Sequence, residues 1–141
     1  MRSTTEPEPE KLLCVLEYFR AVVSPPTGAI SIRRLVLTRA PGAGDPSIAA
    51  TWTECDEPLR PLAVRREGAI ENEAGALQAD FANEYIGGGV IRGGNVQEEI
   101  RFTVCPECLV SMLLCPRMRA DEAVLISGVV QYARYEGYGG S

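Results

Sequence analysis

Residues 79–102 read ADFANEYIGGGVIRGGNVQEEIRF, and this stretch decides the fold class. Residues 77–82 have the composition of a short strand, residues 87–94 are rich in glycine, and a segment of helical character starts at Gln97. Strand, glycine loop and helix start, in that order, are how α/β proteins build anion sites. Bare backbone amides and the positive end of a helix both attract phosphate.

Two adjacent glutamates, Glu98 and Glu99, follow the glycine loop. Two carboxylates beside an anion site can divide the work of glycosidic-bond cleavage: one stays ionised and holds hydroxyl groups, while the other has a raised pKa and donates a proton. Acidic residues are also favoured in the first turn of any helix, so a structural role stays open. Asp80 and Asn83 end the predicted strand, where α/β folds bind ligands, although such residues also cap turns.

The combined string resembles the signature of the poly(ADP-ribose) glycohydrolase family. Its elements are a strand that ends in residues 80–83 (DFAN), three glycines at 87–89, a short spacer, and residues 97–99 (QEE). Further landmarks of the family are matched downstream at 105–107, 126–128 and 135–138, and upstream at 17–20, 26–28 and 68–71. The resemblance covers the chain from about Lys11 to its end.

The resemblance implies a role for each matched residue. Glu99 is the acid-base residue that protonates the leaving ribose oxygen and then activates water, and Glu98 holds the ribose hydroxyls. The substrate-binding set is Asp80 and Asn83 at the ribose, Gln97 beside the acids, Gly87, Gly88 and Gly89 around the diphosphate, Ile70 and Glu71 at the adenine, and Tyr138 on a closing hairpin. The reaction is hydrolysis of a ribose-ribose O-glycosidic bond through an oxocarbenium-like state, with no metal or cofactor. The expected partners are poly(ADP-ribose), ADP-ribose and poly(ADP-ribosyl)ated proteins.

The fold implied by the resemblance is a macrodomain, a three-layer α/β/α arrangement with a mixed central sheet, incomplete at both ends in this chain. Residues 1–10, acidic and proline-rich, are expected to form a disordered tail, and 11–141 a partial catalytic macrodomain. Residue patterns predict helices from Lys11 to the prolines at 25–26, from Gln97, and over 106–118. They predict strands over 29–37, 62–66, 77–82 and 123–130, the last a central parallel strand because it is almost wholly apolar.

Composition excludes several classes of protein. The chain has no histidine, which excludes imidazole-based nucleophile pairs. Its net charge of -5 and the lack of a basic stripe argue against direct DNA binding. The sequence has no run of eighteen apolar residues, so no membrane association is expected, and the acidic start is unlike a signal peptide. Five cysteines fit reduced thiols, and the expected location is the nucleus or cytoplasm.

Two alternatives to the enzyme remain at this stage. One is a binding module that holds ADP-ribose in the same pocket but cannot order Glu99 for catalysis. The other is a redox or zinc-linked domain built on Cys105 and Cys108, although the apolar residues that follow favour buried, inert thiols. The intact acid pair favours the enzyme, since a protein that only binds the ligand has no need of both acids.

Overall fold

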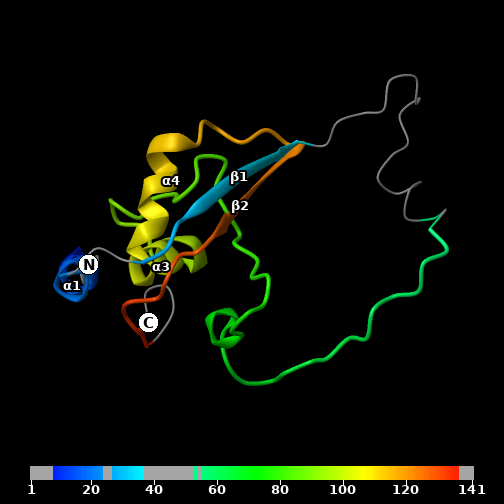
Figure 1. The fold of residues 1–141 in the computed structure, drawn as a ribbon, viewed down its shortest axis with the longest axis horizontal. Helices are drawn as coiled ribbons and strands as arrows, with labels where there is room; N and C mark the ends of the chain where they lie inside the picture. Colours follow the sequence, from blue (N-terminus) through cyan, green and yellow to red (C-terminus); the bar gives the residue numbers. More distant parts are fainter. Residues whose placement is uncertain (1–7, 24–26, 37–52, 54, 137–141) are drawn as a thin grey trace, which may run out of the picture. The chain divides into compact units, whose positions relative to one another are not determined.

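The computed structural model describes residues 8–23, 27–36, 53 and 55–136. The chain folds as two units: residues 1–36 together with 80–141 form the first, and residues 37–79 form the second. Elements of the first unit are α1 (Glu8–Ala21), β1 (Ser31–Val36), α3 (Gln97–Val104), the 3-10 turn η2 (Pro106–Cys108), α4 (Leu109–Leu114) and β2 (Glu122–Ser127) (Figure 1). The second unit contains the 3-10 turn η1 (Ile70–Asn72).

Helix α1 begins earlier than the sequence predicts. Glu8, Pro9 and Glu10 were expected in a disordered tail, but they form its first turn. Proline fits there because its missing N–H has no helical partner in the first turn, and acidic residues favour the positive end of the helix dipole. Residues 1–7 lie outside the described part of the chain. No helix among the described residues is long and apolar enough to cross a membrane.

Strands β1 and β2 pair in antiparallel register, from Ser31 opposite Ser127 to Val36 opposite Glu122. The sequence predicted both strands, but the expected central parallel strand is wrong: β2 pairs with β1 in a two-stranded antiparallel sheet within the described residues. Side chains of β2 are mostly half-buried. An apolar run in a strand therefore does not by itself establish burial on both faces.

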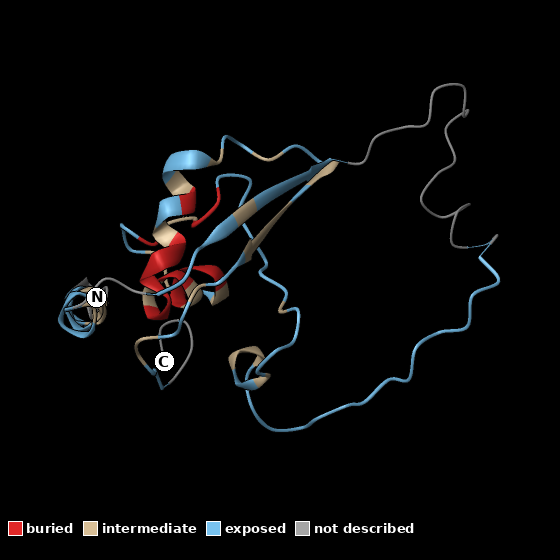
Figure 2. Ribbon diagram, viewed as in Figure 1, coloured by how far each residue is buried: buried red, intermediate tan, exposed pale blue. Residues whose placement is uncertain are grey.

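The core of the first unit lies between the helices and the glycine loop. Figure 2 shows the buried residues gathered in α3, in η2, at the start of α4 and in the loop that precedes α3. The buried cluster consists of Ile86, Val90, Phe102, Val104, Cys105 and Cys108. Since α3 and its loop share one core, the position of the glutamate pair is fixed by apolar packing at both ends.

Two predicted strands are wrong. Residues 62–66 form no strand, and their apolar members Leu62 and Val64 are exposed, with 89% and 81% of their surface accessible. Residues 77–82 form no strand either, because the amides nearby have other acceptors. The amide of Phe81 donates to Oε1 of Gln97, and that of Asn83 donates to Oε2 of Glu98. Side chains of α3 therefore accept the hydrogen bonds that a neighbouring strand would otherwise accept.

Candidate active site

Glu99 joins the start of α3 to the glycine loop. It is the third residue of the helix, and its Oε2 accepts the amide of Val96, the residue before the helix, at 2.9 Å. Its Oε1 accepts the amide of Gly89 at 2.9 Å. The first contact is half of a capping box; valine has no polar side-chain atom to supply the other half. The same carboxylate therefore caps α3 and holds the loop.

Glu98 is buried and accepts one amide from the same loop and one from the residues that precede it. Its Oε1 accepts the amide of Gly87 at 2.6 Å and its Oε2 accepts the amide of Asn83 at 2.9 Å. Only 3% of Glu98 is exposed, so these two donors stand in for water. The structure thus places the two predicted acids side by side, each with its own pair of backbone donors.

Gly88 and Gly94 bring backbone into contact with the carboxylates. Gly88 has φ of +50°, and a Cβ there would lie 2.5 Å from Oε1 of Glu99 and 2.8 Å from Oε2 of Glu98. A Cβ on Gly94 would lie 2.7 Å from Oε1 of Glu99. Both positions therefore require glycine, Gly88 for its backbone conformation and both for space.

The three glycines predicted to wrap a diphosphate already have acceptors within the chain. Gly87 and Gly89 donate to the two glutamates, and Gly88 donates to the carbonyl of Tyr85 at 3.1 Å. In the part of the chain that the structure describes, the loop amides of Ile91 and Gly93 have no acceptor, and both residues are exposed. The second half of the loop therefore offers donors that the first half does not.

Three other predicted residues surround the pair. Oε1 of Gln97 accepts the amide of Phe81 at 2.9 Å, and Oδ1 of Asn83 accepts the amide of Tyr85 at 3.0 Å. The pKa of Asp80 is raised to about 6, first by desolvation and then by the charges of Glu98 and Glu99, against an opposing effect of Arg101. Asp80 is thus electrostatically part of the same acidic group.

The pKa values of the two glutamates shift in opposite directions. Desolvation and the neighbouring charge of Glu99 raise the pKa of Glu98, although its two amide donors partly oppose this. For Glu99 desolvation also acts upward, but the amides of Gly89, Val96 and Glu99 itself, together with Lys11, outweigh it and lower the pKa. From the sequence, the raised pKa was expected on the proton donor, Glu99. In this structure it is Glu98 that has the raised pKa.

Lys11 also belongs to this site, although it was not predicted there from the sequence. Its Nζ, on α1, donates to the carbonyl oxygens of Val90 at 3.1 Å, Arg92 at 3.5 Å and Gly94. Its being the chain's only lysine was the one available signal. Lys11 and the loop are about eighty residues apart in the sequence, so local residue spacing could not predict their contact.

Comparison with known proteins gives this arrangement a family. The model of the poly(ADP-ribose) glycohydrolase family, with a macro domain fold, matches residues 49–141. The chain belongs to the poly(ADP-ribose) glycohydrolase family. It is 41% identical to poly(ADP-ribose) glycohydrolase 1 of Caenorhabditis elegans over 134 residues, and 38% identical to poly(ADP-ribose) glycohydrolase 1 of Arabidopsis thaliana over 141 residues.

These two matches cover 92% and 99% of this chain but 16% and 24% of the relatives. Poly(ADP-ribose) glycohydrolase 2 of Caenorhabditis elegans is 37% identical over 140 residues, with 98% of this chain and 28% of the relative covered. The chain thus spans between about a sixth and somewhat over a quarter of the relatives' lengths. Its helices and small sheet fit part of the family's macrodomain fold.

The remaining predicted site residues are Ile70, Glu71 and Tyr138. Ile70 and Glu71 are half-buried in η1, which belongs to the second unit. Tyr138 lies outside the described residues.

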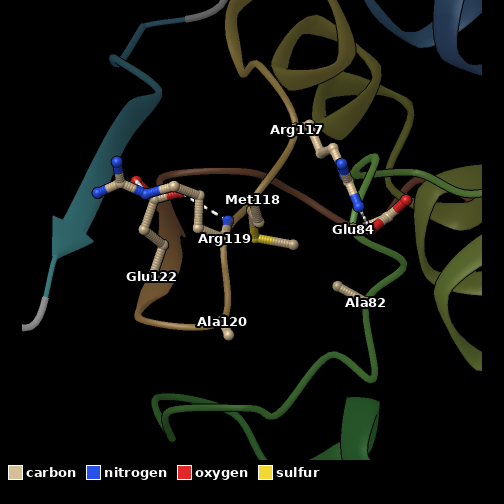
Figure 3. A pocket seen from close by; sticks show the side chains of 7 residues that line it. All are labelled: Ala82, Glu84, Arg117, Met118, Arg119, Ala120 and Glu122. Carbon is tan, nitrogen blue, oxygen red and sulfur yellow. Dashed lines mark hydrogen bonds and ion pairs between the residues drawn. The ribbon is translucent and has the colours of Figure 1, made fainter.

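A cavity of about 590 Å³ opens in the first unit, lined by Ala82, Glu84, Arg117, Met118, Arg119, Ala120 and Glu122 (Figure 3). None of these was predicted as a site residue. Arg117 is directed to Glu84, 2.6 Å away, and the Nε of Arg119 lies 3.2 Å from Glu122. Both arginines are matched by carboxylates, so the cavity has no surplus positive charge with which to hold an anion.

Cys105 and Cys108, on which the zinc or redox alternative rests, are both buried in the core. Desolvation first, and then the neighbouring Cys105, raise the pKa of Cys108 to about 12. A thiol with so high a pKa is almost wholly protonated at neutral pH, whereas the thiolate is the form that binds metal. Among the described residues, no three acidic or thiol side chains are grouped as metal ligands.

Proposed function

We propose that this chain supplies the glycine loop and acid pair of a poly(ADP-ribose) glycohydrolase site. The reaction is hydrolysis of ribose-ribose O-glycosidic bonds, in free polymer or in polymer attached to proteins, with release of ADP-ribose. The observation that carries the proposal is the position of the two adjacent carboxylates at the start of α3, against a loop in which, among the described residues, the exposed amides of Ile91 and Gly93 have no acceptor. The relatives are named for this activity.

In the proposed reaction Glu99 gives its proton to the ribose oxygen that leaves as the bond to the anomeric carbon breaks. Water then attacks that carbon, and Glu99 takes a proton from the water, which restores the acid. Glu98 holds the ribose hydroxyls. The negative diphosphate of the substrate stabilises the positive charge that develops on the sugar.

The lowered pKa of Glu99 sets a requirement on this reaction. A proton donor must be protonated when the substrate is bound, whereas Glu99 without ligand favours the ionised form. A diphosphate held by the exposed amides of Ile91 and Gly93 would bring negative charge to the loop and raise the pKa of Glu99. Substrate binding and activation of the acid are then one event.

The test measures release of ADP-ribose from purified poly(ADP-ribose) by the 141-residue chain, with circular dichroism to confirm folding. Glu99→Gln and Glu98→Gln are a matched pair, since each exchanges one amide-accepting oxygen for an NH2 group. Only Glu99→Gln removes the proton donor, so we expect it to lower the rate by at least about 100-fold and to leave ADP-ribose binding in place. Wild-type rates in Glu99→Gln would refute the assignment.

The second candidate is an ADP-ribose-binding module without hydrolytic activity. It is favoured by one observation: both oxygens of Glu99 already accept backbone amides, as expected of a structural carboxylate. Calorimetric titration of the same samples with ADP-ribose separates the two functions. Binding without release from a folded wild-type chain would favour the module, whereas release that vanishes in Glu99→Gln would favour the enzyme.

A further inference from the structure

The carbonyl groups of the loop over residues 90–94 converge on one nitrogen atom. Nζ of Lys11 donates to the oxygens of Val90 and Arg92, at 3.1 and 3.5 Å, and to that of Gly94. An ammonium group has three N–H donors and no acceptor, so its donors match these three carbonyls. The loop also closes on itself, since the amides of Arg92 and Gly94 both donate to the carbonyl of Gly89, at 2.8 and 3.0 Å.

The same loop residues contact Glu99. The backbone of Gly94 packs so closely on this side chain that a Cβ would lie 2.9 Å from Cγ and 2.7 Å from Oε1. The amide of Gly89 donates to Oε1 of Glu99. Gly94 therefore has Lys11 bonded to its carbonyl oxygen and Glu99 packed against its Cα, which makes it the physical link between the two charged groups.

We propose that Lys11 is a positioning residue of the acid pair: by binding three loop carbonyls it fixes the glycine loop on which the carboxylate of Glu99 rests. Lys11 acts on the acid pair through the loop backbone and through its charge. Its consequence for catalysis rests on the proposed function; its effect on Glu99 does not.

The charges around Glu99 agree with this role. Two other carboxyl groups interact electrostatically with this site: Asp80, which precedes the loop, and Glu98, which adjoins Glu99 on α3. Lys11 on α1 is the cation that acts on Glu99 directly, and its charge contributes to the lowered pKa of that carboxyl group. Without the ammonium group, three neighbouring acids would face one another with less compensation, and the ionised form of Glu99 would be less favoured.

The first arm of the test needs no variant. Because Lys11 is the only lysine, labelling with ¹⁵N-lysine gives one side-chain ammonium signal. An ammonium group bonded to three carbonyls exchanges its protons slowly, so we expect a detectable Nζ–Hζ correlation at neutral pH. A signal lost to rapid exchange, as for a solvated lysine, would overturn the proposal even if every variant failed to fold.

The second arm compares Lys11→Met and Lys11→Arg with Arg20→Met, in the absence of ligand. Arg20 is the matched control, because it is an exposed cation on the same helix whose ion pair is with Glu17 at 3.5 Å. We expect Lys11→Met to raise the titration midpoint of the Glu99 carboxyl carbon and to speed exchange of the Gly94 amide, and Arg20→Met to change neither. Unchanged values in Lys11→Met would refute the role.

Lys11→Arg separates charge from geometry. Arginine keeps the positive charge, but no single nitrogen of its planar group presents three donors. We expect the Glu99 midpoint to stay nearer the wild-type value than in Lys11→Met, while the Gly94 amide still exchanges faster. Equal Gly94 exchange in Lys11→Arg and wild type would show that charge alone suffices and would overturn the geometric part.

The third arm measures ADP-ribose release. Loss of charge-assisted bonds in Lys11→Met should lower kcat by about tenfold or more, with partial recovery in Lys11→Arg and none of this loss in Arg20→Met. If the wild type releases nothing, the proposed function fails, while the two NMR arms still decide the role of Lys11. If Lys11→Met alters the Glu99 titration but keeps the wild-type kcat, Lys11 has a structural role and no effect on catalysis.

Discussion

A Cβ on Gly88 would lie 2.5 Å from Oε1 of Glu99, so the backbone at this position and the acid occupy adjoining space with no room for a side chain. We predict that Gly88→Ala destabilises the chain by at least about 2 kcal/mol, because alanine is strained at a φ of +50° and must also displace a carboxylate. Gly93→Ala is the matched control, since a Cβ there meets nothing within 4 Å. Urea unfolding of both variants checks this; equal midpoints would contradict it.

The two glutamates should stabilise the fold, independently of the role proposed for them in the reaction. In Glu98→Gln or Glu99→Gln the new NH2 group faces a backbone N–H that has lost its acceptor. We expect a cost of about 1–3 kcal/mol for each change, larger for the more buried Glu98. Chemical unfolding at neutral pH measures it. Wild-type stability in both variants would show that the four amide contacts contribute little.

The pKa of Asp80, about 6 in the folded chain against an ordinary 3.8, predicts a pH-dependent effect of Asp80→Asn. The folded state holds this proton more tightly than the unfolded state, so the resulting stability is present below about pH 3.8 and lost as the pH rises through about 6. Asparagine does not ionise, so the variant does not lose this stability as the pH rises. We therefore expect Asp80→Asn to raise the melting temperature relative to wild type more at pH 7.5 than at pH 4.5. The reverse order would contradict the raised pKa.

A third buried carboxylate among the described residues, Glu107, holds the segment after β2. Its Oε2 accepts the amide of Val130 at 2.9 Å and its Oε1 accepts the hydroxyl of Tyr132 at 3.1 Å. Glu107→Ala leaves both donors without this acceptor, and we expect a loss of about 2–3 kcal/mol, against about 1 kcal/mol for Tyr132→Phe. Thermal unfolding compares them. A cost for Tyr132→Phe as large as that for Glu107→Ala would place the stabilisation in the tyrosine hydroxyl alone.

The cysteines should react with iodoacetamide in the order of their exposure and thiolate content. Cys55 is exposed, whereas Cys105 and Cys108 are buried and the pKa of Cys108 is raised to about 12. We expect rapid alkylation of Cys55 and protection of the other two until denaturant is added, measured by mass spectrometry of peptides. Rapid modification of Cys105 and Cys108 that zinc suppresses would instead favour the metal-binding alternative.

Local sequence patterns predicted the helices and the two strands that pair. Helical spacing in α1, the acidic first turn of α3 and the apolar composition of β2 are properties of neighbouring residues. The strand over 77–82 was mispredicted because its amides near Phe81 and Asn83 donate to side chains of α3. Competition for backbone donors by distant side chains leaves no periodic signal.

The candidate site was predicted from a family resemblance to one motif, and its energetics were not. Glu98 and Glu99 have the same side chain, yet their pKa values move in opposite directions. Each accepts different backbone amides, and the charge of Lys11 acts on Glu99. Lys11 itself is far from the motif in sequence. Pair contacts of this kind depend on the fold and cannot be read from spacing.

The first unit is made of two stretches of chain, residues 1–36 and 80–141, and the residues of the second unit come between them in the sequence. These stretches hold each other through the pairing of β1 with β2 and the bonds from Lys11 to the loop over 90–94. A nick within residues 37–79 leaves these contacts intact. The two pieces are then a split protein whose reassembly depends on their concentration. If ADP-ribose binds only the reassembled form, it would shift the equilibrium toward reassembly.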